Sequence, residues 1–234
     1  MFCTNLGTDL IRITNQGGSY TYAWTLNGAP FTQTTADISI AAGGTYEVTA
    51  TNTLTGCETT KTIVVNESEF PLFDLNDLTV FDLTGDGSNR IEILTGIGAL
   101  GIGDYEFALD GGPYQDSPIF EDVPPGIHQV SVRDKNGCGT KSVAASVIGY
   151  PLYFTPNGNG QDDNWQVLGV NGVFQSQSLI YIFDRHGRLL AQIAPDGPGW
   201  DGTYNGTPMP ADDYWFRVGL EDGRTFTGHF SLIR

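Results

Sequence analysis

The residues best suited to chemistry lie in an oxygen-rich loop, 157–164. Asn157, Asn159, Asp162 and Asp163 are spaced among glycines there. Calcium takes about six to eight oxygen ligands, and a tightly turned loop can supply them. The loop lacks the glutamate that completes an EF-hand, and Asn and Gly are also typical of a plain turn with left-handed backbone. Two interpretations stay open: a calcium site formed by these four side chains, or a turn without a ligand.

A second loop, residues 82–89, has a similar composition. It also lacks a glutamate at a suitable distance. A turn before the next strand is favoured over a metal site, because short loop motifs often match by chance.

Residues that could act in catalysis are scattered. The pairs Asp162/Asp163 and Asp212/Asp213 are adjacent in sequence, and neighbours on an extended chain point apart. The three histidines accompany no nucleophile motif such as G-x-S-x-G. We therefore predict a protein that acts by recognition, with no catalytic residues and no cofactor beyond the calcium considered above.

The cysteines Cys3, Cys57 and Cys138 do not have the spacing of metal ligands. Cys3 and Cys57 both belong to the first predicted domain. A Cys3–Cys57 disulfide is therefore predicted for an oxidising compartment. This pairing leaves Cys138 either as a buried thiol or as the remnant of another pair.

The composition indicates short strands and tight turns. The chain has 234 residues, a formal net charge of −16 and 31 glycines. Its acidity argues against binding nucleic acid, whose phosphates it would repel. No apolar run approaches the ~18–20 residues of a membrane-spanning helix. Because Met1 is followed by a largely polar stretch, we expect a fragment whose signal peptide lies further upstream.

Apolar residues that alternate with period two predict an all-β fold of three consecutive small β-sandwich domains. In the first domain, residues 1–66, Tyr20–Leu26 is a strand followed by an Asn27-Gly28 hairpin turn. The stretch 44–51 is another strand, with Tyr46 facing inward. This region resembles the immunoglobulin-like or PKD-like modules of bacterial surface proteins.

The second predicted domain, residues 67–148, contains strands at 90–94, 104–109 and 126–134. The segment from Gly126 to Cys138 parallels the one from Gly44 to Cys57, which indicates an internal repeat. The run YEFALDGGPYQDSPIFEDVPPG followed by VRDKNGC resembles the SprB-like repeats of gliding adhesins.

The third predicted domain, residues 149–234, has hairpin turns at 186–187, 205–206 and 222–223. In the strand after the second turn, Tyr214 and Phe216 should face the core and Trp215 should face outward. Trp215 beside Arg217 is either covered by a neighbouring segment or part of a recognition patch. The last strand is expected at or near an edge, where backbone groups are open to strand addition.

Five blocks in this region, FTPNG…DNW, IFDRHG, GWDGTYNG, DYWF and GHFSL, resemble the type B C-terminal sorting domain of type IX secretion substrates. The resemblance implies an exported cell-surface protein, such as a gliding-motility adhesin, whose partners are the outer-membrane translocon and shuttle proteins. It also implies that loops and the last strand meet the receptor. The residues expected to do so are Thr155, Pro156, Asn157, Gly158, Trp200, Asp201, Gly202, Gly228, His229, Phe230, Ser231, Leu232, Ile233 and Arg234.

Two other functions remain open. The first is a surface module that binds carbohydrate or calcium, in which Trp200 and Tyr204 stack on a polysaccharide. Burial of Trp200 as a plug at the end of the sandwich is the favoured alternative. The second is a passive spacer stalk.

Overall fold

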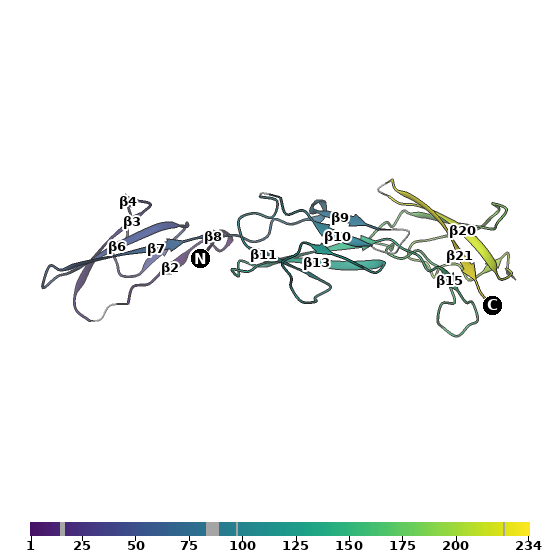
Figure 1. The fold of residues 1–234 in the computed structure, drawn as a ribbon, viewed down its shortest axis with the longest axis horizontal. Helices are drawn as coiled ribbons and strands as arrows, with labels where there is room; N and C mark the ends of the chain where they lie inside the picture. The colour runs from purple at the N-terminus through teal and green to yellow at the C-terminus, as the bar shows by residue number, and fades with distance from the viewer. Residues whose placement is uncertain (15–16, 83–88, 97, 222) are drawn as a thin grey trace. The chain divides into compact units, whose positions relative to one another are not determined.

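The computed structural model describes residues 1–14, 17–82, 89–96, 98–221 and 223–234. Across these residues the chain forms β-strands and two short 3₁₀ turns, η1 (Thr4–Leu6) and η2 (Leu75–Asp77), and none of them lies in an α-helix (Figure 1). The predicted all-β class is confirmed. Within the same ranges there is no helix long and apolar enough to cross a membrane.

The chain divides into two compact units. Unit 1 contains residues 1–77, 94–118 and 130–143, and unit 2 contains 78–93, 119–129 and 144–234. The three domain boundaries expected from the sequence stay a prediction.

The first part of unit 1 has three small sheets. One has the order β4-β3-β6-β7, the second pairs β2 with β5, and the third pairs β1 in parallel with β8. Trp24 and Tyr46 of the four-stranded sheet pack with Ile38 and Ile40 in one buried cluster. The strands are β1 (Phe2–Cys3), β2 (Asp9–Ile11), β3 (Tyr20–Leu26), β4 (Ala29–Pro30), β5 (Ile38–Ile40), β6 (Gly44–Asn52), β7 (Glu58–Val65) and β8 (Glu67–Ser68).

The β3–β4 turn follows the expected hairpin chemistry. Asn27 and Gly28 have φ angles of +50° and +82°. Both central residues of a type I′ turn need positive φ, which Asn and Gly adopt at little cost. The predicted Asn27-Gly28 turn is confirmed.

The middle of the chain supplies two further sheets. β9 (Leu78–Phe81), β10 (Arg90–Ile93) and β12 (Ile119–Phe120) form one, in the order β12-β10-β9. β11 (Tyr105–Leu109), β13 (Gly126–Asp134) and β14 (Thr140–Val147) form the other, in the order β11-β13-β14.

The disulfide joins Cys3 to Cys138, with their Cα atoms 5.3 Å apart, and Cys57 is an exposed free thiol. The predicted Cys3–Cys57 pair is therefore wrong. β1 pairs with β8 and thereby places Cys3 opposite Ser68. Cys57 immediately precedes β7, whose opposite end leads into β8. A strand of eight residues spans about 26 Å, so Cys57 lies far from Cys3.

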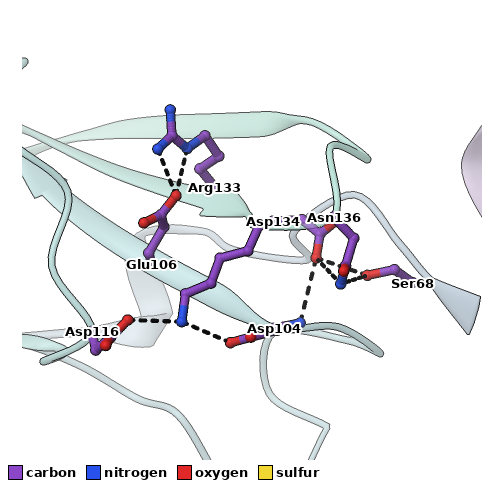
Figure 2. Close-up of polar contacts among 8 residues, drawn as sticks. Ser68, Asp104, Glu106, Asp116, Arg133, Asp134 and Asn136 are labelled. Carbon is purple, nitrogen blue, oxygen red and sulfur yellow. Dashed lines mark hydrogen bonds and ion pairs between the residues drawn. The ribbon is translucent and has the colours of Figure 1, made fainter. Parts of the chain in front are cut away.

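A buried carboxylate organises the chain around Cys138. Asp134 accepts a hydrogen bond from Ser68 Oγ at 2.7 Å, as Figure 2 shows. It accepts another from the Cys138 backbone N–H at 3.1 Å. Asn136 donates to both Asp134 and Ser68. Because a buried carboxylate needs such donors, this network fixes the β13–β14 turn beside β8.

In unit 2 the C-terminal residues form a five-stranded sheet in the order β15-β21-β20-β16-β17. β21 is therefore second from one edge, and the expected edge or near-edge position is confirmed. The strands are β15 (Tyr153–Phe154), β16 (Leu179–Phe183), β17 (Leu189–Ile193), β20 (Asp212–Gly219) and β21 (Thr225–Leu232), with a separate hairpin of β18 (Thr203–Tyr204) and β19 (Thr207–Pro208). Figure 1 shows β20 and β21 as the long neighbouring strands near the C-terminus.

Aromatic rings fill the core beneath this sheet. The Trp165 ring stacks on Phe230 with centroids 4.0 Å apart, and Trp200 contacts Tyr214 and Phe230. Trp165 and Trp200 also pair through their backbones as an isolated bridge. Both indoles are buried, which agrees with Trp200 as a plug.

Candidate functional site

Three segments that are distant in sequence meet at one end of the C-terminal sheet. β15 pairs in parallel with the end of β21, and the Ile233 N–H donates to the Phe154 carbonyl at 3.0 Å. Arg234 donates through Nη2 to the Gly202 carbonyl at 3.3 Å and through Nε to the Met209 carbonyl at 3.0 Å. We call this surface the terminal patch: residues 155–158, 201–202 and 233–234.

Gly202 explains why the segments can approach so closely. Its φ is +77°, and an added Cβ would lie 2.8 Å from Leu232 Cδ1 and 3.3 Å from both Phe154 and Pro156. Only glycine accepts both constraints at low cost. The close packing of the three segments in the terminal patch therefore depends on glycine at position 202.

The residues expected to meet a receptor divide by burial into three groups. The side chains of Trp200, Phe230 and Leu232 are buried in the core, so they support the surface from beneath. Gly202 is buried as well, and Thr155, Pro156, Gly228 and Ser231 are half-buried. The residues exposed to solvent are Asn157, Gly158, Asp201, His229, Ile233 and Arg234.

A second surface lies on the solvent side of the same sheet. We call it the outer aromatic face: Leu179, Tyr181 and Phe183 of β16, Leu189 of β17, and Trp215 and Arg217 of β20. Cross-strand pairing places Tyr181 opposite Arg217 and Phe183 opposite Trp215. These residues line two open depressions of 480 and 450 Å³, which share Phe183 and Arg217.

Sequence reasoning found only Trp215 and Arg217 of this face. The strand Leu179–Phe183 is apolar at every position, so alternation does not reveal which side is buried. Ile180 and Ile182 enter the core, which leaves the aromatic residues on the outside. The apolar character of every position in Leu179–Phe183 was the one sequence signal that could have indicated this face.

Residues 148–232 match the family model of the CHU_C type IX secretion signal domain. The resemblance of this region to a type IX sorting domain is thereby confirmed. The terminal patch and the outer aromatic face both lie in this signal domain, apart from Ile233 and Arg234, which directly follow the matched residues.

No curated protein matches the chain. Among solved structures, a Bacteroides ovatus mixed-linkage glucan utilization locus protein, SGBP-B in complex with a heptasaccharide, is 12% identical, with 98% of this chain and 64% of that chain covered and a TM-score of 0.25. Extracellular domains 3–5 of Drosophila OTK are 10% identical, over 97% and 92% of the two chains, with a TM-score of 0.26. The three N-terminal domains of the bacteriophage RB49 Hoc protein are 14% identical, over 94% and 90%, with a TM-score of 0.28. Likenesses this weak carry no argument, and this chain spans less than two thirds of the first structure's length.

The oxygen-rich loop of the signal domain is bonded within itself. Asp163 accepts backbone N–H bonds from Asn157 at 2.9 Å, Gly158 at 2.6 Å and Gly160 at 2.7 Å. Asn157 and Asn159 each accept a backbone N–H from the residue two positions on. These oxygens are thus engaged by donors of the same loop, and Asp162 is exposed.

Across the described ranges, no group of three or more His, Cys, Asp or Glu side chains is placed to hold a metal. The 82–89 loop lies largely outside the described residues.

Asp163 gives the loop a predicted pH dependence. The backbone N–H groups of Gly158 and Gly160 lower the pKa of Asp163 below its usual 3.8. Its carboxylate therefore stabilises the loop above about pH 3.8, and this contribution is lost as the pH falls through the lowered pKa. We expect the amide NMR resonances of Gly158 and Gly160 to titrate together below pH 3.8, and Asp163→Asn to abolish that titration. Titration above this value would contradict the arrangement.

An ion pair with a buried carboxylate ties residue 82 to the signal domain within unit 2. Asp82 Oδ1 accepts from Arg224 Nη1 at 2.8 Å, and Oδ2 accepts from the Ile148 backbone N–H at 3.0 Å. The Asp82 side chain is 4% exposed and that of Arg224 is 36% exposed. Sequence reasoning could not find this pair, because it joins residues 142 positions apart.

We expect Asp82→Asn to lower the free energy of unfolding of unit 2 by about 1.5–3 kcal/mol, the usual range for losing a hydrogen bond to a charged group. The partial exposure of Arg224 keeps the loss at the lower end, because water can solvate its guanidinium. Chemical denaturation measures the change. Asp196→Asn, an exposed aspartate of the same unit, is the matched control and should have little effect. Equal losses for the two variants would contradict a role for the pair.

The histidines do not form an acid–base site with one another. His128 is buried and contacts the Pro124 carbonyl through Nε2 at 2.7 Å, as expected for a residue on an inward strand face. His186 lies in the exposed turn after β16, and His229 lies on β21 beside Trp215. The signal domain therefore offers surfaces for contact, and the titratable groups named here do not converge in one pocket.

Proposed function

We propose that the signal domain is the address by which type IX secretion machinery recognises this polypeptide and exports it to the cell surface. The observation that carries the proposal is the family match over residues 148–232, in the region where five sequence blocks resemble sorting domains. The residues upstream would then be exported cargo, arranged as two immunoglobulin-like modules of a surface adhesin. Recognition requires no bond-making step by the signal domain.

Two features of the domain support recognition through its folded shape. The terminal patch is assembled from three segments. A receptor that contacts all three therefore binds the folded domain and not the unfolded chain. The patch is also supported by a core in which Trp165, Trp200 and Phe230 are almost completely buried. We infer that the exporter or its shuttle contacts the exposed residues Asn157, Asp201 and Arg234.

The test is export of a reporter in a type IX-competent cell. The reporter carries a Sec signal peptide and is fused either to residues 149–234 or to residues 67–234. We expect at least the longer fusion to reach the cell surface, because residue 82 is bonded into unit 2. A fusion to residues 1–148 is the matched control and should stay in the periplasm. If neither signal-bearing fusion reaches the surface, the proposed function is wrong.

A further inference from the structure

The outer aromatic face exposes several large apolar side chains close together. Leu179, Leu189 and Trp215 are 47%, 46% and 41% exposed, and they surround the two depressions. Scattered apolar residues on a surface need no explanation, but a contiguous group beside depressions indicates a binding surface.

Arg217 carries a charge without an ion-pair partner among the residues that the structure describes. The other arginines on the strands and turns of this sheet each pair with an aspartate: Arg185 with Asp212, Arg188 with Asp184 and Arg224 with Asp82. Arg217 is exposed, and no described residue forms an ion pair or side-chain hydrogen bond with it. In a chain of net charge −16, an unpaired guanidinium among aromatic rings is complementary to a carboxylate from another molecule.

The backbone of β21 is open next to this charge. β15 pairs only with Ser231 and Leu232, and the N–H groups of Ser231 and Ile233 bond to residues of the β15 segment. Backbone groups of alternate residues face the same side of a strand. Those of Thr225, Thr227 and His229 therefore continue this row beyond the end of β15, and no described residue bonds to them there.

The open half of β21 and the outer aromatic face are continuous. Thr227 lies directly across from Arg217, and His229 lies across from Trp215. Thr227 also lines one of the depressions together with Phe183 and Trp215. Because Thr227 is small, the long Arg217 side chain can extend over it towards a strand added to β21.

We propose that this continuous surface binds an extended, acidic segment of another protein. The segment adds to the open half of β21, places a carboxylate on Arg217 and sets apolar side chains on the rings of Tyr181, Phe183 and Trp215. The proposal rests on the proposed function, and the segment would belong to a protein that receives or retains the exported chain. A uronic-acid polysaccharide could also meet Arg217 and the rings, but it would leave the backbone row of β21 unpaired.

Tryptophan fluorescence of the full chain tests the proposal directly. Trp215 is 41% exposed, whereas Trp24, Trp165 and Trp200 are at most 3% exposed, so a ligand on this face changes chiefly the Trp215 signal. The probe is a short amidated peptide in which threonine alternates with leucine, aspartate and tyrosine. Matched probes are the same peptide with lysine in place of aspartate, and a uronic-acid oligosaccharide.

We expect saturable binding of the acidic peptide and at least about tenfold weaker binding of the lysine peptide, as expected for one charge-assisted hydrogen bond. Arg217→Gln should weaken binding of the acidic peptide by a similar factor. Arg12→Gln, which removes the same charge from an exposed position of unit 1, should not. Thr227→Glu should also weaken binding, because the new carboxylate occupies Arg217. If Arg217→Gln lowers the melting temperature, binding by the Thr227→Glu variant is compared with the wild type instead.

Absence of acidic-peptide binding, unchanged binding by the variants, or tighter binding of the oligosaccharide would each overturn the proposal. Export in cells separates this inference from the proposed function. If the Arg217→Gln chain binds no peptide yet is exported and retained like the wild type, while a chain lacking 148–234 is not exported, the inference is wrong and the sorting function stands. If the truncated chain is still exported, the sorting function itself fails.

Discussion

Replacing Trp165 with alanine should lower the free energy of unfolding of the signal domain by about 3–5 kcal/mol. The side chain is fully buried, its ring stacks on Phe230, and its Nε1 donates to the Pro151 carbonyl at 2.8 Å. Truncation removes the ring stacked on Phe230 and leaves a cavity beneath β20 and β21. It also leaves the Pro151 carbonyl without its hydrogen-bond donor. Urea denaturation followed by circular dichroism measures the loss.

Trp215→Ala is the matched control for this variant. It removes the same ring from an exposed position of the same sheet, and its cost should stay below about 1 kcal/mol. Equal losses for the two variants would show that Trp165 does not lie in the core described here. Because the terminal patch is supported by this core, the Trp165→Ala chain should also be exported less efficiently.

Removing the Cys3–Cys138 disulfide should lower the free energy of unfolding of unit 1 by about 3–5 kcal/mol. The bond closes a loop between residues 135 positions apart, and in the chain-entropy account a longer loop restricts the unfolded state more. Cys3→Ser and Cys138→Ser should give the same loss, and the double variant should lose no more than either.

Cys57→Ser is the control, because Cys57 is an exposed thiol outside the bond. It should leave the melting temperature unchanged, and a reducing agent should lower the melting temperature of this variant as much as that of the wild type. A large loss for Cys57→Ser with no effect of Cys138→Ser would restore the pairing that the sequence favoured.

Local pattern predicted several of the longer strands but not the short ones. The alternation in Tyr20–Leu26 and the sequence Asn27-Gly28 are signals within one hairpin, and the structure has both β3 and its turn there. The outward direction of Trp215 and the inward direction of Tyr214 and Phe216 follow from the same period of two. The convergence of the FTPNG loop, the Gly202 loop and the C-terminus could be suspected only from the resemblance.

Contacts across long stretches of chain could not be predicted. The Asp82–Arg224 pair and the Cys3–Cys138 bond depend on which strands become neighbours, and no periodicity within a segment encodes that choice. The outer aromatic face was missed for another reason. Every residue of Leu179–Phe183 is apolar, so the pattern does not distinguish a strand buried on both faces from one that keeps a face for a partner.

The connectivity of the disulfide has a consequence for biogenesis. If the proposed export delivers this chain from its N-terminal side, Cys57 reaches an oxidant before Cys138 does. A Cys3–Cys57 bond, which the structure does not have, could then form first. A hairpin forms within about 10 μs, far faster than thiol oxidation. Early closure of β6 against β7 therefore carries Cys57 away from the segment that Cys3 will join. On this order of events, rapid closure of the β6–β7 hairpin favours the Cys3–Cys138 bond over a Cys3–Cys57 bond.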